Sequence, residues 1–260
     1  IEANSRVGGG TRTTENTLPG LLHDDCSAFH PIGVASPAFQ RFGLEEFGLE
    51  WLWPEIQLAH PLDGGTAGAV WRDVAETAAA LGVDGPAWAQ LFSPIVRRFD
   101  DLVADALAPV AHWPKHPITF ARFGLHALLP ATVLARRWVT PEARALFGGV
   151  AAHLFGELNR PLSGSVGMML TAAAHAKGWP VAKGGSRAIA DAMTAKLLSL
   201  GGEIETDRLV ESLDQLGSPD VVMLDTSARA AADIIGQRMP GRMAASFRRF
   251  RYGPAAFKVD

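Results

Sequence analysis

The spacing of hydrophobic residues divides the chain into three parts. Residues 1–53 are rich in Gly and Pro and are expected to be mostly loops, whereas apolar residues recur at helical spacing through residues 73–177. Between these parts, residues 56–60 and 69–71 predict the strands of a hairpin, because Asp63-Gly64-Gly65 supplies residues that accept a positive φ. Helices are expected at residues 73–81, 87–108, 118–128, 131–138, 141–158 and 166–176.

After Trp179 the pattern becomes mixed. Gly184-Gly185-Ser186 begins a helix that ends at Gly201-Gly202 and whose apolar positions share one face, namely Ile189, Met193, Leu197 and Leu200. Short apolar runs at residues 203–206, 209–213 and 221–224 predict strands, and residues 227–236 predict a helix. The alternation predicts an α/β domain that is split by a mainly α-helical segment of about a hundred residues.

Composition bounds the class of protein. The 260 residues are 48% hydrophobic and 20% charged, with a formal net charge of −3, which is typical of a chain that folds around one or two cores. Phosphate binding draws on clustered Lys and Arg, so no nucleic-acid partner is expected. Two local basic groups, Arg136-Arg137 and residues 247–251, are interpreted as solvated helix faces, with an anionic ligand or lipid surface as the alternative.

Nothing in the sequence indicates an oxidising compartment or a membrane span. Cys26 is the single cysteine, so no intrachain disulfide can form, and a cytoplasmic location is predicted. The most hydrophobic stretch, residues 120–138, is interrupted by Arg122, His126, Pro130, Arg136 and Arg137, and is therefore predicted to form buried amphipathic helices. No amphipathic basic helix requires membrane contact, and no pattern sets the oligomeric state.

Several kinds of site are excluded by spacing. His112 and His116 are the closest histidine pair, but Pro114 between them breaks the helix that would place both on one side of a metal, so no metal site is predicted. Residues 164–167 lack the Gly-x-Ser-x-Gly spacing of a serine-hydrolase elbow. Residues 183–186 hold the residue types of a phosphate-binding loop in the wrong order.

The opening segment carries the remaining candidate chemistry. In dinucleotide-binding folds, a carboxylate at the end of the second strand accepts hydrogen bonds from the ribose, which is the interpretation of Glu2. Gly8 and Gly9 allow the backbone to approach a pyrophosphate, and Arg12 offers a bidentate cation. An ordinary surface turn is the alternative interpretation of the same residues.

Two blocks of the sequence resemble a known family. The first comprises Glu2-Ala3, Val7 to Thr13, Leu18-Pro19-Gly20 and His23-Asp24, and the second comprises Gly178-Trp179-Pro180, Gly184-Gly185, Gly201 to Thr206 and Val210. Together they resemble the phytoene-dehydrogenase-related NAD(P)/FAD-dependent oxidoreductases, a branch of the flavin amine-oxidase superfamily. The resemblance implies a partial FAD-binding, Rossmann-like domain at residues 1–72 and 179–260, split by a helical substrate domain at residues 73–178.

The resemblance also implies roles for individual residues. Glu2 would bind the FAD ribose, Gly8 and Gly9 would lie beside the pyrophosphate, and Val210 would present its backbone to the adenine. Many members have Arg directly after the Gly-Gly pair, whereas this chain has Arg12 two residues later. The N-terminal Gly-x-Gly-x-x-Gly unit and the C-terminal flavin-binding segment of the family have no counterpart here, so residues 1–260 alone are expected to be an internal fragment that binds FAD poorly.

For the intact protein, the resemblance implies hydride transfer from a hydrophobic small molecule to flavin. No catalytic acid or base is assigned. An amine oxidase that consumes oxygen and a non-catalytic scaffold are the alternatives. The helical segment is expected to hold an apolar substrate pocket, or else a packed core, around residues such as Met168, Met169 and Trp179.

Overall fold

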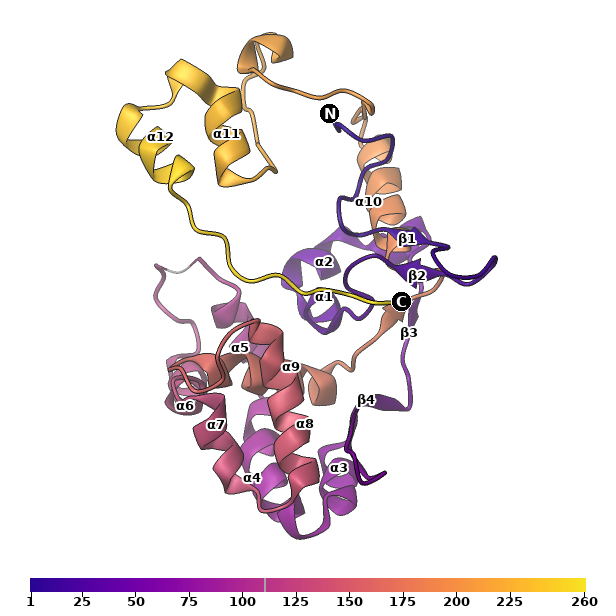
Figure 1. The fold of residues 1–260 in the computed structure, drawn as a ribbon, viewed down its shortest axis with the longest axis vertical. Coiled ribbons are helices and arrows are strands. Elements are labelled where there is room, and N and C mark those ends of the chain that lie inside the picture. The colour runs from indigo at the N-terminus through magenta and orange to yellow at the C-terminus, as the bar shows by residue number, and fades with distance from the viewer. Residues whose placement is uncertain (110) are drawn as a thin grey trace. The chain divides into compact units, whose positions relative to one another are not determined.

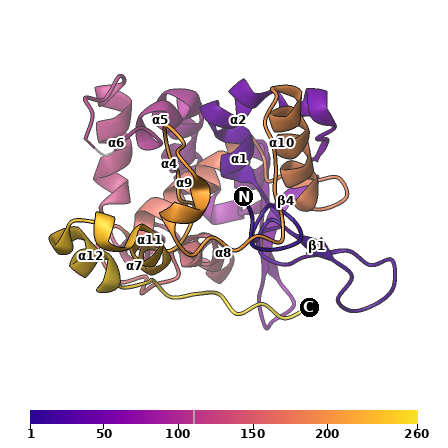
Figure 2. The same ribbon diagram turned by 90° about the horizontal axis from the view of Figure 1, so that it is seen from above.

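The computed structural model describes residues 1–109 and 111–260 and divides the chain into two compact units. Unit 1 comprises Ile1–Gly9 and Leu197–Ala255, and unit 2 comprises Gly10–Lys196 and Ala256–Asp260. The fold is mixed: about half of the chain is helical, and a few short two-stranded sheets accompany the helices. Figure 1 shows the elements of each unit and Figure 2 shows the same ribbon from above.

The central part of unit 2 is a helical bundle. Helix α9 packs against α4, α6 and α8, which surround it in Figure 1. The helices are α3 (Val74–Ala80), α4 (Gly85–Val96), α5 (Phe99–Ala106), α6 (Pro117–Ala127), α7 (Ala131–Leu134), α8 (Pro141–Ala151) and α9 (Ser163–Ala176), joined in part by the 3-10 turns η2 (Gly82–Asp84), η3 (Ala135–Arg137) and η4 (Ala152–Leu154). The predicted helical character of residues 73–177 is confirmed.

The helix predicted at 131–138 is an α-helix only over α7 and continues as η3, and two longer predicted helices are also shorter than their hydrophobic patterns. The stretch 87–108 is divided between α4 and α5, because Pro94 lies inside α4 and lacks an N–H, and Arg98 N bonds to Ile95 O in a tighter turn. The stretch 141–158 ends as an α-helix at Ala151, and Phe155 adopts a left-handed backbone with φ 52°.

Aromatic side chains form the centre of the bundle. Trp88, Phe92, Trp138 and Phe147 are all fully buried. The Trp88 and Trp138 rings lie 5.1 Å apart, and the Trp138 and Phe147 rings lie 5.2 Å apart. Burial of such large apolar surfaces is the main term that stabilises the helical part.

The predicted hairpin is confirmed. Strands β4 (Ile56–Pro61) and β5 (Ala67–Trp71) pair antiparallel with Ala59 opposite Ala69, and Gly65 turns the chain at φ 79°. The hairpin packs closely on α8, because a Cβ added to Gly68 would lie 2.5 Å from the carbonyl oxygen of Glu142. A side chain at this position would therefore separate the hairpin from the bundle.

Short elements complete unit 2. They are strands β1 (Thr13–Thr14), β2 (His23–Asp24), β3 (Trp51–Leu52) and β6 (Val181–Ala182), helices α1 (Pro31–Ala35), α2 (Pro37–Phe42) and η1 (Leu44–Phe47), and most of α10 (Arg187–Ser199). β1 pairs with β2, and β3 pairs with β6, both antiparallel. A second apolar core joins this region to α10 through Leu44, Leu49, Ala182, Ile189 and Ala192.

Unit 1 contains η5 (Leu213–Leu216), α11 (Ala228–Ile235), η6 (Gly236–Arg238) and α12 (Gly241–Arg248). The helix predicted at residues 227–236 is confirmed, and Ser227 caps it through the Ala230 N–H. The strands predicted at 203–206, 209–213 and 221–224 do not form, so those predictions are wrong. A strand needs a hydrogen-bonded neighbour, and the exposed side chains of Val221 and Met223 have no sheet to cover. Among the described residues no Rossmann sheet is evident.

Candidate functional site

A hydrogen-bonded cluster in unit 2 joins the two glycine-rich blocks. Thr13 Oγ1 donates to Asp24 Oδ1 at 2.6 Å across the β1–β2 ribbon, where these two residues are paired. The backbone N–H of Ser186 donates to the same Asp24 oxygen at 2.7 Å, and that of Arg187 donates to Thr13 Oγ1 at 3.1 Å. The N-terminal ribbon thus accepts hydrogen bonds from the first residues of the segment that starts α10.

Gly185 makes this junction possible. Its φ of 95° lies in the region that favours glycine, and an added Cβ would lie 2.3 Å from Thr13 Oγ1. Gly184 also has a positive φ, 82°, but a Cβ there would meet no atom within 4 Å. The two glycines therefore differ: Gly185 is needed for backbone shape and close contact, and Gly184 for backbone shape alone.

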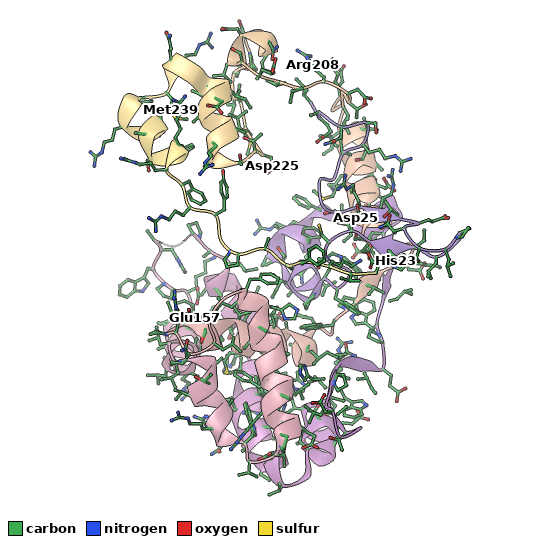
Figure 3. The ribbon with its side chains drawn as sticks, viewed as in Figure 1. His23, Asp25, Glu157, Arg208, Asp225 and Met239 are labelled. Atoms are coloured by element: carbon green, nitrogen blue, oxygen red, sulfur yellow. The ribbon has the colours of Figure 1, made fainter. Side chains whose placement is uncertain are left out.

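Arg12 lies at the edge of the same ribbon. Its Nε is 3.2 Å from Asp25 Oδ2, and its carbonyl accepts hydrogen bonds from the Asp25 N–H and the Ser186 hydroxyl. Thr14 Oγ1 donates to the other Asp25 oxygen at 2.6 Å. Figure 3 labels Asp25 and the neighbouring His23 on the ribbon. The Arg12 side chain is 53% exposed, so its guanidinium can contact an anionic ligand while it remains paired with Asp25.

Glu2 lies in unit 1, where the opening residues run beside residues 205–208. Glu2 N donates to Glu205 O, Arg208 N donates to Glu2 O, and Asp207 N donates to Asn4 O, at 2.8 to 3.0 Å. These bonds hold the two segments side by side, but they do not form the regular ladder of a sheet. The alternate half-buried positions 204, 206, 208 and 210 have the period of two of a strand with one covered face.

The Glu2 carboxylate is ionised and accepts its hydrogen bonds mainly from Asn4. The backbone N–H and the side-chain amide of Asn4 both donate to Glu2 Oε1, at 2.7 and 2.6 Å. These hydrogen bonds, the backbone bond first, lower the pKa of Glu2 below its usual value. Oε2 has no hydrogen bond to any described residue, so an acceptor remains for a ligand hydroxyl.

Gly8, Gly9 and Val210 also belong to unit 1. Gly8 has φ 111° and Gly9 has φ 53°, and a Cβ at Gly9 would meet no atom within 4 Å. The space around this backbone is therefore open to a ligand. Val210 is half-buried and follows the segment that pairs with Glu2. The structure thus brings Glu2 together with the segment that leads to Val210, whereas Arg12 lies in unit 2.

His30 is a site residue that the sequence did not indicate. Its ring is 5.8 Å from that of Trp51, its backbone N–H donates to Pro180 O, and its Nε2 is buried with no hydrogen-bond partner among the described residues. Burial lowers the pKa of His30, although the Asp24 carboxylate partly offsets this, so the ring is neutral at physiological pH. A single histidine after an irregular segment carries no local signal of such a position.

The helical part of unit 2 contains an open cleft of about 440 Å³ between α5 and the end of α9. Charged side chains line it in pairs: Lys177 Nζ is 2.7 Å from Asp100, and Arg98 is 3.2 Å from Asp101. Met168 is fully buried, Trp179 is 8% exposed, and Met169 packs against the same core. Of the two expectations for these three residues, the packed core is the one found.

Two further kinds of site are a metal centre and a membrane-spanning helix. Within the described ranges 1–109 and 111–260, no group of three or more His, Cys, Asp or Glu side chains is placed to hold a metal ion. Over the same ranges, no single helix is long and apolar enough to cross a membrane. The pair Pro117–Ala127 and Ala131–Arg137 together has sufficient length and apolar composition for a span, but the two helices are bent by 90° relative to each other.

Comparison with known proteins identifies no family for this chain. It matches no protein-family model and no curated protein. A functional assignment depends on the two sequence blocks and on the contacts that their residues make.

Proposed function

We propose that the chain forms part of the FAD-binding region of an oxidoreductase that resembles the phytoene-dehydrogenase-related enzymes. Glu2 binds the adenosine ribose, Gly8 and Gly9 allow the pyrophosphate to approach the backbone, Arg12 neutralises part of its charge, and Val210 lines the adenine. In this proposal the fold is a Rossmann-like domain that a helical substrate domain interrupts. The reaction is dehydrogenation of a hydrophobic small molecule.

The observation that carries the proposal is the contact between the two sequence blocks. Asp24 and Ser186 are 162 positions apart in the sequence, and they are joined by a 2.7 Å hydrogen bond. The family resemblance of each block depends on its local residue pattern. That pattern contains no information on whether the two blocks are in contact. Their contact in unit 2 supports the interpretation of the two blocks as parts of one fold in preference to two unrelated surface turns.

The residues of unit 1 are compatible with FAD. The Glu2 carboxylate is ionised and has a free oxygen, and the backbone at Gly9 is unobstructed. Hydrogen bonds between residues 2–4 and 205–208 join Glu2 to the segment that leads to Val210. FAD, when bound, supplies the hydride acceptor. The chain's own residues hold its ribose and phosphates.

The test uses the full-length protein that contains residues 1–260. Its purified form is expected to show the absorption spectrum of bound flavin. Glu2→Gln is expected to weaken FAD binding by about tenfold or more, because a charged acceptor of ribose hydroxyls contributes roughly 1.5–3 kcal/mol. Glu45→Gln, at an exposed position of η1, is the matched control and is expected to leave FAD affinity unchanged.

Absence of flavin binding in the folded full-length protein, even with added FAD, would refute the proposal. Equal affinity of Glu2→Gln and Glu45→Gln would refute the role of Glu2. Where flavin binds, anaerobic reduction by candidate hydrophobic substrates separates an oxidoreductase from a scaffold, and peroxide release in air identifies an oxidase.

A further inference from the structure

Helix α6 has apolar side chains on two opposite faces. Phe120, Phe123 and Ala127 face inward and pack in the helical core. On the other face, Ile118 and Leu125 are each 70% exposed, and they are seven residues apart, so they lie on one line along the helix. A surface helix of a soluble domain ordinarily has polar residues there.

The exposed face continues past the end of α6. Leu128 and Leu129 follow the helix and are 59% and 37% exposed. The N–H of Leu162 donates to Leu128 O at 3.0 Å, which fixes Leu162 beside them, and its side chain is 55% exposed. We call these five residues, Ile118, Leu125, Leu128, Leu129 and Leu162, the α6 patch.

Leu162 adopts a costly backbone conformation at this place. Its φ of 70° lies in the left-handed region, where a non-glycine residue costs roughly 1–2 kcal/mol. The conformation leaves a large apolar side chain in solvent, so core packing does not repay the cost. Such a combination of strain and exposure is typical of a residue that serves a binding surface.

The charged side chains of residues 106–141, the stretch that contains α6, have one sign. Residues 106–141 contain no Asp or Glu and four Lys or Arg, namely Lys115, Arg122, Arg136 and Arg137. All four are exposed, and none forms an ion pair with any residue that the structure describes. The preceding acids are already occupied: Asp101 pairs with Arg98, and Asp105 accepts the backbone N–H groups of Lys115 and His116.

Trp113 lies in the same basic stretch and is 88% exposed. Tryptophan is enriched at the boundary between lipid headgroups and acyl chains, because its ring is apolar and its N–H is polar. An exposed Trp in the same stretch of chain as exposed Leu and Ile side chains and unpaired cations matches the composition of a segment that lies on a membrane.

We propose that the α6 patch is a docking surface for an anionic phospholipid membrane, with α6 lying in the plane of the interface. The helix has 11 residues, so it extends about 16 Å, far less than the roughly 30 Å of a bilayer core. The leucines and Ile118 enter the acyl boundary, and the four cations contact the phosphates of the headgroups.

The test is co-sedimentation of the purified chain with vesicles. Binding is expected to vesicles of equimolar phosphatidylcholine and phosphatidylglycerol, and to be much weaker with phosphatidylcholine alone or at high salt. The double variant Ile118→Ser/Leu125→Ser is expected to bind about tenfold or more weakly, because two aliphatic side chains that would enter the acyl region of the membrane are lost. Leu200→Ser/Leu209→Ser, at positions 75% and 65% exposed, is the matched control and is expected to bind normally.

A charge-reversal pair separates lipid recognition from general stickiness. Arg136→Glu/Arg137→Glu is expected to lose about tenfold or more in affinity for the anionic vesicles, whereas Arg242→Glu/Arg249→Glu, on and beside α12, changes net charge equally and is expected to have a smaller effect. All substituted side chains are exposed, so the variants are expected to keep the circular dichroism spectrum of the parent chain.

Failure of the folded chain to bind anionic vesicles would overturn the proposal. Equal loss in the patch variants and their controls would also overturn it, since binding would then not involve α6. If the chain forms a dimer without lipid, and Ile118→Ser/Leu125→Ser makes it monomeric, then the α6 patch is an interface between two copies and the membrane proposal is wrong.

Discussion

The buried His175 is expected to make stability fall between about pH 6.5 and pH 4. Its side chain belongs to α9 and is 3% exposed. Trp88 Nε1 donates to His175 Nε2 at 3.0 Å, and His175 Nδ1 lies 3.3 Å from Arg72 O. The Trp88 bond requires an unprotonated Nε2, so the neutral ring with its proton on Nδ1 satisfies both neighbours. Burial, which outweighs the opposing hydrogen bonds to the backbone carbonyls of Arg72 and Trp71, lowers the pKa of His175 from 6.5 to about 4.

The sign and size of the effect follow from proton linkage. The unfolded chain protonates His175 below its ordinary pKa of 6.5, whereas the folded chain resists protonation down to about 4. The contribution is therefore complete above pH 6.5 and is lost as pH falls toward 4. At roughly 1.4 kcal/mol per pKa unit, the whole interval corresponds to about 3 kcal/mol, of which about 2 kcal/mol is lost between pH 7 and pH 5.

Urea unfolding of the parent chain and of His175→Gln, at pH 7 and pH 5, measures this contribution. Glutamine keeps an acceptor for Trp88 but does not titrate, so the variant is expected to lose about 2 kcal/mol less than the parent over the same pH change. His126→Gln, at a half-exposed position of α6, is the control and is expected to follow the parent. If the parent and His175→Gln lost equal stability between pH 7 and pH 5, the assignment of His175 as a neutral ring with hydrogen bonds at both nitrogens would be wrong.

Two further predictions concern single contacts. Asp84 is 3% exposed and accepts hydrogen bonds from the backbone N–H groups of Val139 and Thr140, just before α8, at 2.8 Å each. Asp84→Asn is therefore expected to lower the free energy of unfolding by about 2 kcal/mol or more, and an unchanged urea midpoint would contradict this. Gly185→Ala combines a strained backbone with a close contact to Thr13, so it is expected to destabilise the chain by more than Gly184→Ala, which should cost about 1 kcal/mol. Equal losses of stability in thermal unfolding would show that the Thr13 contact is not tight.

The helical part of the fold could be predicted because its signals are local. Spacing of apolar residues predicts α3 and the start of α8 closely, and in the structure Asp73 and Thr140 cap these helices by accepting an N–H of the first turn. The strands at 203–206, 209–213 and 221–224 failed for the opposite reason. An apolar run becomes a strand only when another segment supplies hydrogen bonds, and here residues 2–4 supply three bonds to residues 205–208 alone.

The candidate site was predictable in residue type but not in arrangement. Gly8 and Gly9 were chosen as residues that allow close approach to the backbone, and both have a positive φ in the structure. The cluster of Thr13, Asp24 and Ser186 could not be found in the same way, because its members are common surface residues, and a separation of 162 positions leaves no periodic signal. Whether Glu2 and Val210 bind FAD stays a prediction.

Residues 120–138 were predicted to form buried amphipathic helices, and α6 and α7 do bury one face, but hydropathy alone does not show that the other face of α6 exposes Leu125. Phe123 and Ala127 on one face and Ile118 and Leu125 on the other have similar apolar character, so the sequence cannot tell which face the protein covers. Arg122 was one of the residues that argued against a membrane-spanning helix at residues 120–138, because a charge interrupts a membrane span. The same charge is favourable on a helix that lies along an anionic surface, where the guanidinium remains among the headgroups. The feature that argued against a spanning helix therefore supports an interfacial one, and only the exposure of Ile118 and Leu125 distinguishes the two cases.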